Sequence, residues 1–316
     1  MFASFTPSQA GQHQILVTFR GKHLKESPFT LEVVDRPVYR RDYSQVGDQP
    51  VSTFGSEGEG DGQFIKPYSV ACNSRGEIVV IEFVNNRIQV FDRNGTFLFK
   101  FGSKGNGNGQ FNKPYGVTVD QLNDQIVVGD TDNHRIQIFD EKGTFLRVFG
   151  SNGKADGKFN RPEGIFVDQK RNYIVADFCN HRIQIFNSQG QFIRKFGSNG
   201  AGNDQMQNPV GIGLLSNGNI VVGEHNGNRL LIFDFQGNFV WIVGAGQMSS
   251  PHHLFVDSDD NILVADYNNK RIQVFHQNGN HIKSIGSGQI TFPLGVCMDF
   301  EGRIIVSEYS NRISIF

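Results

Sequence analysis

The chain has 316 residues, and its 30 Lys and Arg against 31 Asp and Glu give a formal net charge of −1. This balance excludes binding of nucleic acid by whole-molecule charge, so such binding would need a local basic face. The 37 glycines and 29 phenylalanines, with apolar residues in short runs, predict many strands and tight turns. Because three cysteines cannot form a disulfide framework and no long apolar segment occurs, we expect a cytoplasmic, reducing location.

Residues 3–34 alternate short apolar segments with turn residues, which predicts strands. The run Ser27-Pro28-Phe29 resembles the end of a filamin-type immunoglobulin repeat, although Glu26 stands where that repeat has Gly. The resemblance covers about three of the seven strands of such a sandwich. We therefore expect residues 1–35 to be a partial filamin/Ig-like repeat in a fragment of a longer protein, and residues 36–50 to be a polar connector.

From residue 51 onward, one phrase of the form Arg-Ile-Gln-Ile-Phe returns six times. It begins at Arg87, Arg135, Arg182, Arg229, Arg271 and Arg312. This period is that of a four-stranded propeller blade. Each unit predicts a strand a that starts at Pro-x-Gly, a strand b that ends in an acid, a strand c that carries the phrase, and a strand d that ends in Phe-Gly.

The two ends of the repeat region predict how the ring closes. The sixth unit stops at Phe316, the end of its strand c, whereas residues 51–55 form a d-type strand with no blade before it. Pairing the two would remove an open sheet edge. The fold class predicted is therefore all-β, a six-bladed β-propeller over residues 51–316 closed by the N-terminal strand 51–55.

The repeat also suggests a family. Asn133-His134-Arg135 and Asn180-His181-Arg182 resemble the Asn-His-Leu triplet of the NHL repeat, with Arg in place of Leu. A filamin-type module followed by an NHL propeller resembles the TRIM-NHL family, and is closest in type to its heterochronic, RNA-binding developmental regulators. That resemblance implies a RING, B-boxes and a coiled coil elsewhere in such a protein. Zinc and ubiquitin-ligase activity would belong to those domains, so we expect neither catalysis nor a cofactor from the residues here.

Acidic residues recur before an Arg in every unit, and features present in all blades are expected to build the blade. We predict acid–Arg pairs across each b–c hairpin. They are Glu82–Arg87, Asp130–Arg135, Asp177–Arg182, Glu224–Arg229, Asp266–Arg271 and Glu308–Arg312.

Function is expected where the blades differ, in the d–a and b–c loops that share one face. Cations for phosphates and rings for stacking occur there, which suits single-stranded or looped RNA. The predicted RNA-binding residues are Lys66, Tyr68, Lys113, Tyr115, Arg161, Phe178, His252 and Tyr267. The resemblance implies mRNA as partner and post-transcriptional repression as outcome. A protein–protein scaffold that recruits cargo to a TRIM-type ubiquitin ligase remains the alternative, and neither a membrane nor a small-molecule substrate is expected.

Enzymatic alternatives find little support in the sequence. The axis-facing starts of strand a do not make a metal-ligand set; they are Tyr68, Tyr115, Glu163, Val210, His252 and Leu294. The Gly-rich runs at 58–62 and 105–109 precede strands rather than helices, so they are not phosphate loops. We expect them to be flexible inter-blade connections.

Overall fold

The computed structural model describes residues 11–15, 18–19, 22–23, 29–33 and 41–316, with side chains over 41–316. The chain divides into two units, Met1–Tyr39 and Arg40–Phe316. In the first unit, β1 (Gly11–Ile15) pairs antiparallel with β4 (Phe29–Val33), and β2 (Thr18–Phe19) pairs with β3 (Lys22–His23). The predicted filamin-type repeat lies largely outside the described residues and stays a prediction.

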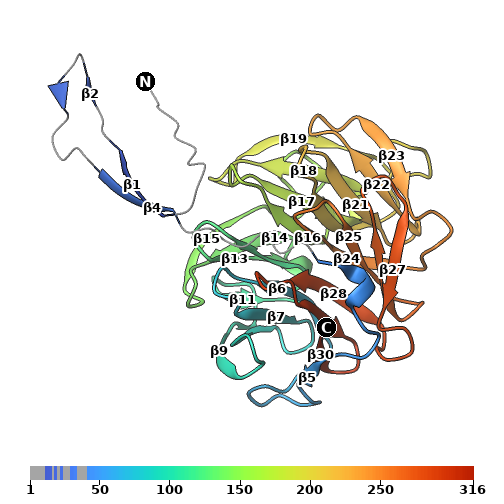
Figure 1. Cartoon of the computed structure of the whole chain (residues 1–316). Coiled ribbons are helices and arrows are strands. Elements are labelled where there is room, and N and C mark those ends of the chain that lie inside the picture. The colour runs from blue at the N-terminus through green and yellow to red at the C-terminus, as the bar shows by residue number, and fades with distance from the viewer. Residues whose placement is uncertain (1–10, 16–17, 20–21, 24–28, 34–40) are drawn as a thin grey trace. The chain divides into compact units, whose positions relative to one another are not determined.

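The second unit is the six-bladed β-propeller that the repeat predicts. Six antiparallel four-stranded sheets follow one another along residues 41–316 (Figure 1). In order a to d, blades 1 to 3 consist of β6 (Pro67–Cys72), β7 (Ile78–Glu82), β8 (Arg87–Phe91) and β9 (Phe97–Phe101); β12 (Val117–Asp120), β13 (Gln125–Asp130), β14 (Arg135–Phe139) and β15 (Phe145–Phe149); and β16 (Pro162–Val167), β17 (Tyr173–Asp177), β18 (Arg182–Phe186) and β19 (Phe192–Phe196).

Blades 4 to 6 repeat this order. They consist of β20 (Pro209–Leu214), β21 (Ile220–Glu224), β22 (Arg229–Phe233) and β23 (Phe239–Val243); β24 (Pro251–Val256), β25 (Ile262–Asp266), β26 (Arg271–Phe275) and β27 (His281–Ile285); and β28 (Pro293–Met298), β29 (Ile304–Glu308), β30 (Arg312–Ile315) and β5 (Ser52–Phe54). The remaining elements are β10 (Ser103–Lys104), β11 (Gln110–Phe111) and the 3-10 turns η1 (Tyr43–Gln45), η2 (Thr131–Asn133) and η3 (Phe178–Asn180).

The last blade is built from both ends of the propeller sequence. Strand β5 pairs antiparallel with β30, with Phe54 opposite Ile313 and Ser52 opposite Ile315. The Val51 amide also donates to the Ile315 carbonyl at 2.7 Å. The fourth position of blade 6 is thus filled by residues that precede blade 1.

The Pro-x-Gly start of strand a follows from close packing around the axis. The a strands of neighbouring blades contact one another, such as β16 with β20 and β28 with β6 (Figure 1). A Cβ placed on Gly164 would lie 1.7 Å from the Val210 carbonyl oxygen, and one on Gly116 would lie 1.9 Å from that of Glu163. Glycine is therefore required at both positions, because any side chain would overlap the next blade.

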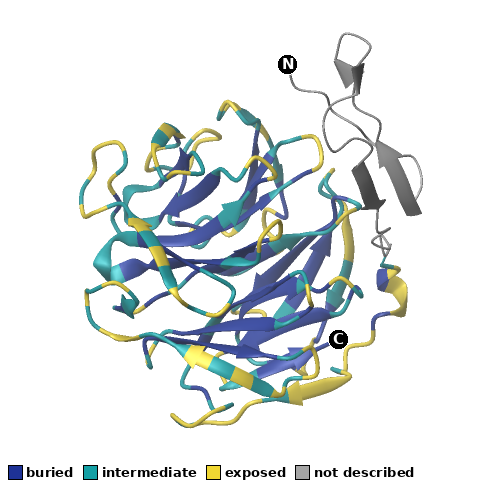
Figure 2. Ribbon diagram, turned by 90° about the vertical axis from the view of Figure 1, so that its left-hand side faces the viewer, coloured by how far each residue is buried: buried dark blue, intermediate teal, exposed yellow. Residues whose placement is uncertain are grey.

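The core lies between the blades. Phe139 of β14 is fully buried and contacts Phe101 of the preceding blade at a ring-centroid distance of 5.0 Å and Phe111 at 5.6 Å. Within residues 41–316, the inner strands are buried along their length, and exposed residues gather in loops and outer strands (Figure 2). This alternation of sheets and aromatic layers gives a rigid platform for the loops.

Part of the predicted connector packs on the propeller. Tyr43 is 3% exposed, and its hydroxyl donates to Asp257 Oδ2 at 2.6 Å. The Lys283 ammonium donates to the Val46 carbonyl at 2.5 Å. Residues 41–46 are thus held against blade 5. Among the described residues, no helix has the length and apolar character that crossing a bilayer requires.

Candidate binding face at the channel mouth

The acids and arginines predicted to pair do so in all six blades. Each acid is directly opposite its arginine in the b–c ladder, and every one of the six acids is 0% exposed. The N–O distances are 2.7 Å for Asp130–Arg135, 2.7 Å for Asp177–Arg182, 3.0 Å for Asp266–Arg271 and 2.8 Å for Glu308–Arg312, and Glu82–Arg87 and Glu224–Arg229 also pair. These pairs build the hairpins and are not free to bind a ligand.

The same arginines also fasten the loops between blades. Arg87 donates to the carbonyls of Glu59, Gly60 and Gln63, at 2.6 Å, 3.0 Å and 3.1 Å. Gly62 donates from its amide to the Gln89 side chain at 3.0 Å. Buried side chains of strand c thus satisfy backbone groups of the Gly-rich run 58–62, which connects blades 6 and 1 as expected, and its flexibility stays a prediction.

The Asn-His-Arg triplet proves to be a joint between blades. Asn133 donates to Asp130 and to the Gly105 carbonyl, both at 2.8 Å. His134 has a left-handed backbone with φ of 57°, and its Nδ1 accepts from the Arg161 amide of the next blade at 3.1 Å. Asn and His tolerate this conformation better than most residues. The same joint recurs where Asn86 accepts from Lys113 and His181 accepts from Asn208.

Each joint places one side chain at the rim of the face. The residue before the strand-a proline has a positive φ in every blade: Lys66, Lys113, Arg161, Asn208, Ser250 and Phe292. Three of these six are cations. Lys113 and Arg161 keep 53% and 36% of their side chains exposed. The left-handed turn thus presents the predicted cations of blades 1 to 3 in equivalent positions.

Aromatic and imidazole rings fill the centre of the face formed by the b–c and d–a loops, around the propeller axis. We call this centre the channel mouth and the whole face the channel-mouth face. Tyr68 contacts Tyr115 edge-on at 4.3 Å between centroids, and its hydroxyl lies 3.2 Å from His252 Nδ1. His252 also packs against Tyr267 at 4.9 Å and against His225 at 4.7 Å. His252 is only 6% exposed, so it supports the surrounding rings instead of lying open to solvent.

The cations stack on these rings. Arg161 lies over Tyr115 at 5.6 Å and donates to its hydroxyl at 3.3 Å. Lys113 lies 5.9 Å over Phe83, and Lys66 lies 4.7 Å over Tyr309, which is 38% exposed. Phe178 is half-buried at the start of η3, where its amide donates to the Arg161 carbonyl at 3.2 Å. Ring contacts thus join six of the eight predicted residues, with Lys113 linked to Tyr115 through Phe83, whose ring lies 4.9 Å from that of Tyr115. Lys66 contacts the separate ring of Tyr309, and a backbone hydrogen bond places Phe178 beside Arg161.

The centre of the mouth carries little charge at neutral pH. Burial lowers the pKa of His225, of His252 and of His253, to about 4 for His253. Burial also holds the pKa of Tyr68 well above its ordinary value. His225 Nδ1 and His253 Nε2 have no hydrogen-bond partner within residues 41–316. Both nitrogen atoms are buried, so the centre of the mouth presents neutral rings to an incoming group.

Two acidic residues lie at the mouth: Glu163, which is largely neutral near pH 7, and Asp132, which pairs with two cations. Glu163 is 3% exposed, and burial raises the pKa of its carboxyl to about 8, against the opposing effect of Arg161. Asp132 Oδ2 lies 3.4 Å from Lys113 Nζ, and Asp132 Oδ1 lies 3.4 Å from Arg161 Nε. Lys113 and Arg161 therefore share one carboxylate partner, Asp132, beside a Glu163 that is largely neutral near pH 7.

We expect Glu163→Gln to stabilise the protein at alkaline pH. Because the folded state raises this pKa from 4.5 to about 8, it binds the proton more tightly than the unfolded chain, and stability is lost as pH rises through that window. Glutamine cannot ionise, so the variant should gain up to a few kcal/mol over the wild type at pH 9 and almost nothing at pH 5, at about 1.4 kcal/mol per pKa unit. Urea unfolding at both pH values checks this, with exposed Glu57→Gln as control. An equal gain at pH 5 and pH 9 would contradict it.

The sequence interpretation missed two members of this face. Phe292 packs on Tyr267 at 5.1 Å and lies under the Lys270 ammonium at 4.7 Å. Its position directly before Pro293 matches that of Lys66 before Pro67, which could have identified it. Asp132 lies inside η2, and nothing in the repeat singled it out. No group of His, Cys, Asp or Glu able to hold a metal ion occurs among the described residues.

Comparison with known sequences supports the repeat. The NHL repeat family matches residues 111–139, 159–186 and 248–275. Rat E3 ubiquitin-protein ligase TRIM71 is 39% identical over 97 residues, which is 31% of this chain and 11% of that protein. Protein lin-41 of Caenorhabditis elegans is 36% identical over 98 residues, 31% of this chain and 8% of its own length. Protein brain tumor of Drosophila melanogaster is 45% identical over 47 residues, 15% of this chain and 4% of that protein.

Solved structures show the same fold at low sequence identity. A streptogramin B lyase superposes with a TM-score of 0.60 at 14% identity, covering 84% of this chain and 96% of that one. A gluconolactonase from Xanthomonas campestris gives 0.64 at 13% identity, covering 81% and 87%. These likenesses concern the propeller alone. The matches to TRIM71 and lin-41 span about a tenth of those proteins. Over this region the chain carries NHL repeats that are homologous to the NHL repeats of these two TRIM-NHL proteins.

Proposed function

We propose that this propeller is an RNA-binding module that recognises a hairpin or a short single-stranded motif in mRNA through the channel-mouth face. Repression of the bound messenger in the cytoplasm is the outcome that we propose for the whole protein. The observation that carries the proposal is the row of Lys66, Lys113 and Arg161 beside uncharged aromatic rings. The sequence resemblance to RNA-binding developmental regulators favours the same assignment.

The two halves of the face suit the two chemical parts of RNA. Exposed cations neutralise phosphates without reading sequence. Half-buried rings such as Tyr115 and Phe83, together with exposed Tyr309, offer surfaces on which bases stack, each worth about 1–3 kcal/mol. A basic rim around a neutral centre therefore fits a single-stranded or looped segment better than a duplex.

We expect the triple variant Lys66→Asn, Lys113→Asn, Arg161→Asn to lose most RNA affinity. Asn208 occupies the same left-handed position in blade 4 with φ of 59°, so the fold itself accepts asparagine there. Removal of three phosphate contacts should lower affinity by about 100-fold or more in low salt and make the salt dependence shallower by about three units of slope. The measurement is selection from a random RNA pool, followed by titration of the enriched RNA over a series of salt concentrations.

A matched control uses cations away from the face. Lys100 and Lys195 lie on outer strands and pair with Asp61 and Asp156, at 2.6 Å and 2.5 Å. Changing both to Gln alters net charge but should leave the selected RNA bound. If no RNA is enriched even in low salt, the RNA proposal fails. The same face would then be assigned to a protein partner, such as cargo of a ubiquitin ligase.

A further inference from the structure

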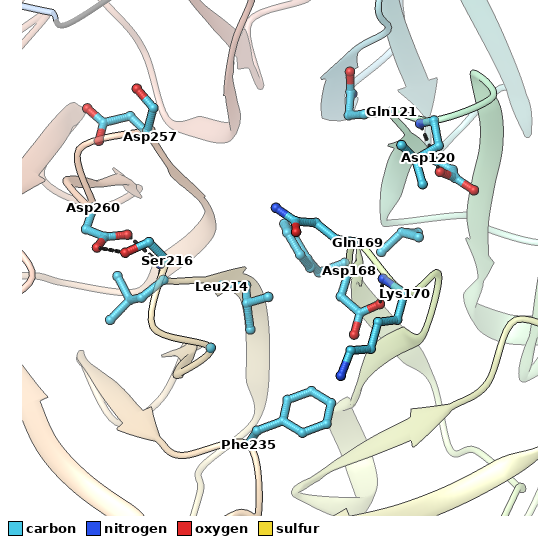
Figure 3. Close-up of a pocket in the computed structure, with 16 residues that line it drawn as sticks. Asp120, Gln121, Asp168, Gln169, Lys170, Leu214, Ser216, Phe235, Asp257 and Asp260 are labelled. Atoms are coloured by element: carbon cyan, nitrogen blue, oxygen red, sulfur yellow. Dashed lines mark hydrogen bonds between the residues drawn. The ribbon is translucent and has the colours of Figure 1, made fainter. Parts of the chain in front are cut away.

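A cavity opens at the end of the propeller opposite the face with Lys66, Lys113 and Arg161, where strand a ends. It has a volume of about 760 Å³ and is bordered by the a–b turns of blades 2 to 5, the ends of β16 and β20, and the c–d turn of blade 4 (Figure 3). This volume lies within the ~300–1,000 Å³ typical of ligand clefts. We call it the aspartate-rimmed pocket, after Asp168, Asp257 and Asp260 on its border.

The pocket is apolar where other blades are polar. Phe235 stands in the c–d turn of blade 4, at a position filled elsewhere by Arg93, Glu141, Ser188 and Gln277. Leu122, 68% exposed, stands in the a–b turn of blade 2, at a position filled elsewhere by Arg75, Lys170, Asn217, Asp259 and Glu301. Together with Phe166 and Leu214, these two residues give the cavity an apolar lining. The repeat does not need either departure, because the same turns form in other blades with polar residues.

A cation–π contact with Arg194 holds the Phe235 ring in place. The Arg194 guanidinium lies over its ring at 4.3 Å from the centroid. The phenyl ring points toward the cavity across from Lys170 and Leu214 (Figure 3). An apolar ring held in place on the wall of a cavity is available to pack against an inserted side chain.

The border of the pocket carries excess negative charge. Asp120 pairs with Arg171 at 2.6 Å, but Asp168, Asp257 and Asp260 form no ion pair with Lys or Arg within residues 41–316. Turn amides and side chains hold these carboxylates in place; Asp168 Oδ1, for example, accepts from the Asn172 amide at 2.7 Å. Each carboxylate oxygen can accept more than one hydrogen bond. The lining thus carries four carboxylates against the ammonium of Lys170, with the Arg194 guanidinium beside Phe235, and the remaining negative charge favours cations over phosphate.

We propose that the aspartate-rimmed pocket binds a short segment of a partner protein in which one or two large apolar side chains are flanked by Lys or Arg. The apolar side chain enters between Phe235 and Phe166, and the flanking cations face Asp168 and Asp257. Burial of one such side chain supplies most of the affinity, and the opposed charges supply specificity and association rate. The proposal is independent of RNA binding, because it concerns the other face.

The test uses a defined peptide and the full chain. The probe is fluorescein-labelled Arg-Arg-Leu-Phe-Arg-Arg, titrated by fluorescence anisotropy at low and at physiological salt. Two altered probes carry Ser-Ser in place of Leu-Phe, or Glu in place of every Arg. Saturable binding of the first probe, weakened at least about tenfold in both altered probes, is the expected result.

Variants locate the binding. Phe235→Ser introduces the residue that blade 3 has at Ser188, and should weaken the first probe about tenfold. The single change Asp168→Asn keeps the turn, because Asn73 already accepts from the Arg75 and Glu77 amides at 3.0 Å and 2.9 Å in blade 1. It should lower affinity several-fold and flatten the salt dependence.

The control is Phe300→Ser, which removes a more exposed aromatic ring from the a–b turn of blade 6, outside the pocket. Its affinity for the probe should equal that of the unchanged chain, and melting temperatures of all variants report folding. Absence of saturable binding at low salt overturns the proposal. So does binding that Phe235→Ser leaves unchanged, or that Phe300→Ser weakens as much.

Discussion

Asp177→Ala should destabilise the propeller by about 3–5 kcal/mol, because it leaves a buried guanidinium without its acid. Asp177 is 0% exposed and accepts from Arg182 Nε at 2.7 Å, the Asn160 amide at 2.7 Å, Asn180 at 2.9 Å and Gln184 at 3.1 Å. One substitution thus removes the acceptor of four donors from three different segments. Urea unfolding followed by tryptophan fluorescence and by circular dichroism measures the loss.

The matched change is Asp156→Ala. Asp156 also pairs with a cation, Lys195 at 2.5 Å, but both side chains are about half exposed, 52% and 46%. An exposed pair contributes at most about 1 kcal/mol. If the two alanine variants unfold at the same urea concentration, the acid–Arg pairs do not hold the blades together.

Much of the fold could be predicted because it repeats. Residues that recur at one position in six units reveal strand order, blade boundaries and the acid–Arg pairing without any knowledge of three-dimensional distances. Gly116 and Gly164 show the limit of that reading, since only the structure reveals the carbonyl oxygens of the next blade that exclude a side chain. The period predicted where each strand lies, and the packing around the axis explains why glycine stands at its start.

The candidate sites depend on contacts between blades, and a repeat pattern contains no information on those. Nothing in the Asn-His-Arg triplet indicates that His134 accepts from the Arg161 amide, 27 residues later in the next blade. The raised pKa of Glu163 follows from burial that no local spacing indicates. Phe235 and Leu122 are distant in sequence and border one cavity only because blades 2 and 4 both reach it. Residues that differ between blades can be identified from the sequence as candidate site residues. Only the structure shows which of them lie in contact with one another.

The two sites lie at opposite ends of strand a, which has a physical consequence. A ligand at the channel mouth and a ligand in the aspartate-rimmed pocket do not compete for the same atoms, and the packed a strands between them are rigid. Opposite charge also separates the partners, since cations border one site and carboxylates border the other. The two proposed ligands are therefore compatible with each other on one propeller.

Replacing residues 51–55 by a Gly-Ser sequence of equal length should lower the melting temperature by about 10 °C and promote aggregation. Phe54 packs against Phe91 at 4.9 Å and Phe64 at 6.3 Å, and β5 closes the ladder of β30. The lost burial of the Phe54 ring and the weaker strand pairing of Gly and Ser, which have low β propensity, together amount to about 5 kcal/mol. In a domain of this size the melting temperature falls by about 2 °C per kcal/mol.

The replacement also exposes the edge of β30, where Ile313 and Ile315 would be open to pairing with another molecule. Light scattering should therefore detect association that the unchanged chain does not show. A synthetic peptide of residues 50–56, added in excess, should restore both the melting temperature and the monomeric state by occupying the vacant place. Ser52→Ala, in the same strand but exposed, serves as the control and should melt like the unchanged chain. A melting temperature that the replacement leaves unaltered would mean that blade 6 is stable with three strands, and that ring closure rests on the packing of β28 against β6 instead.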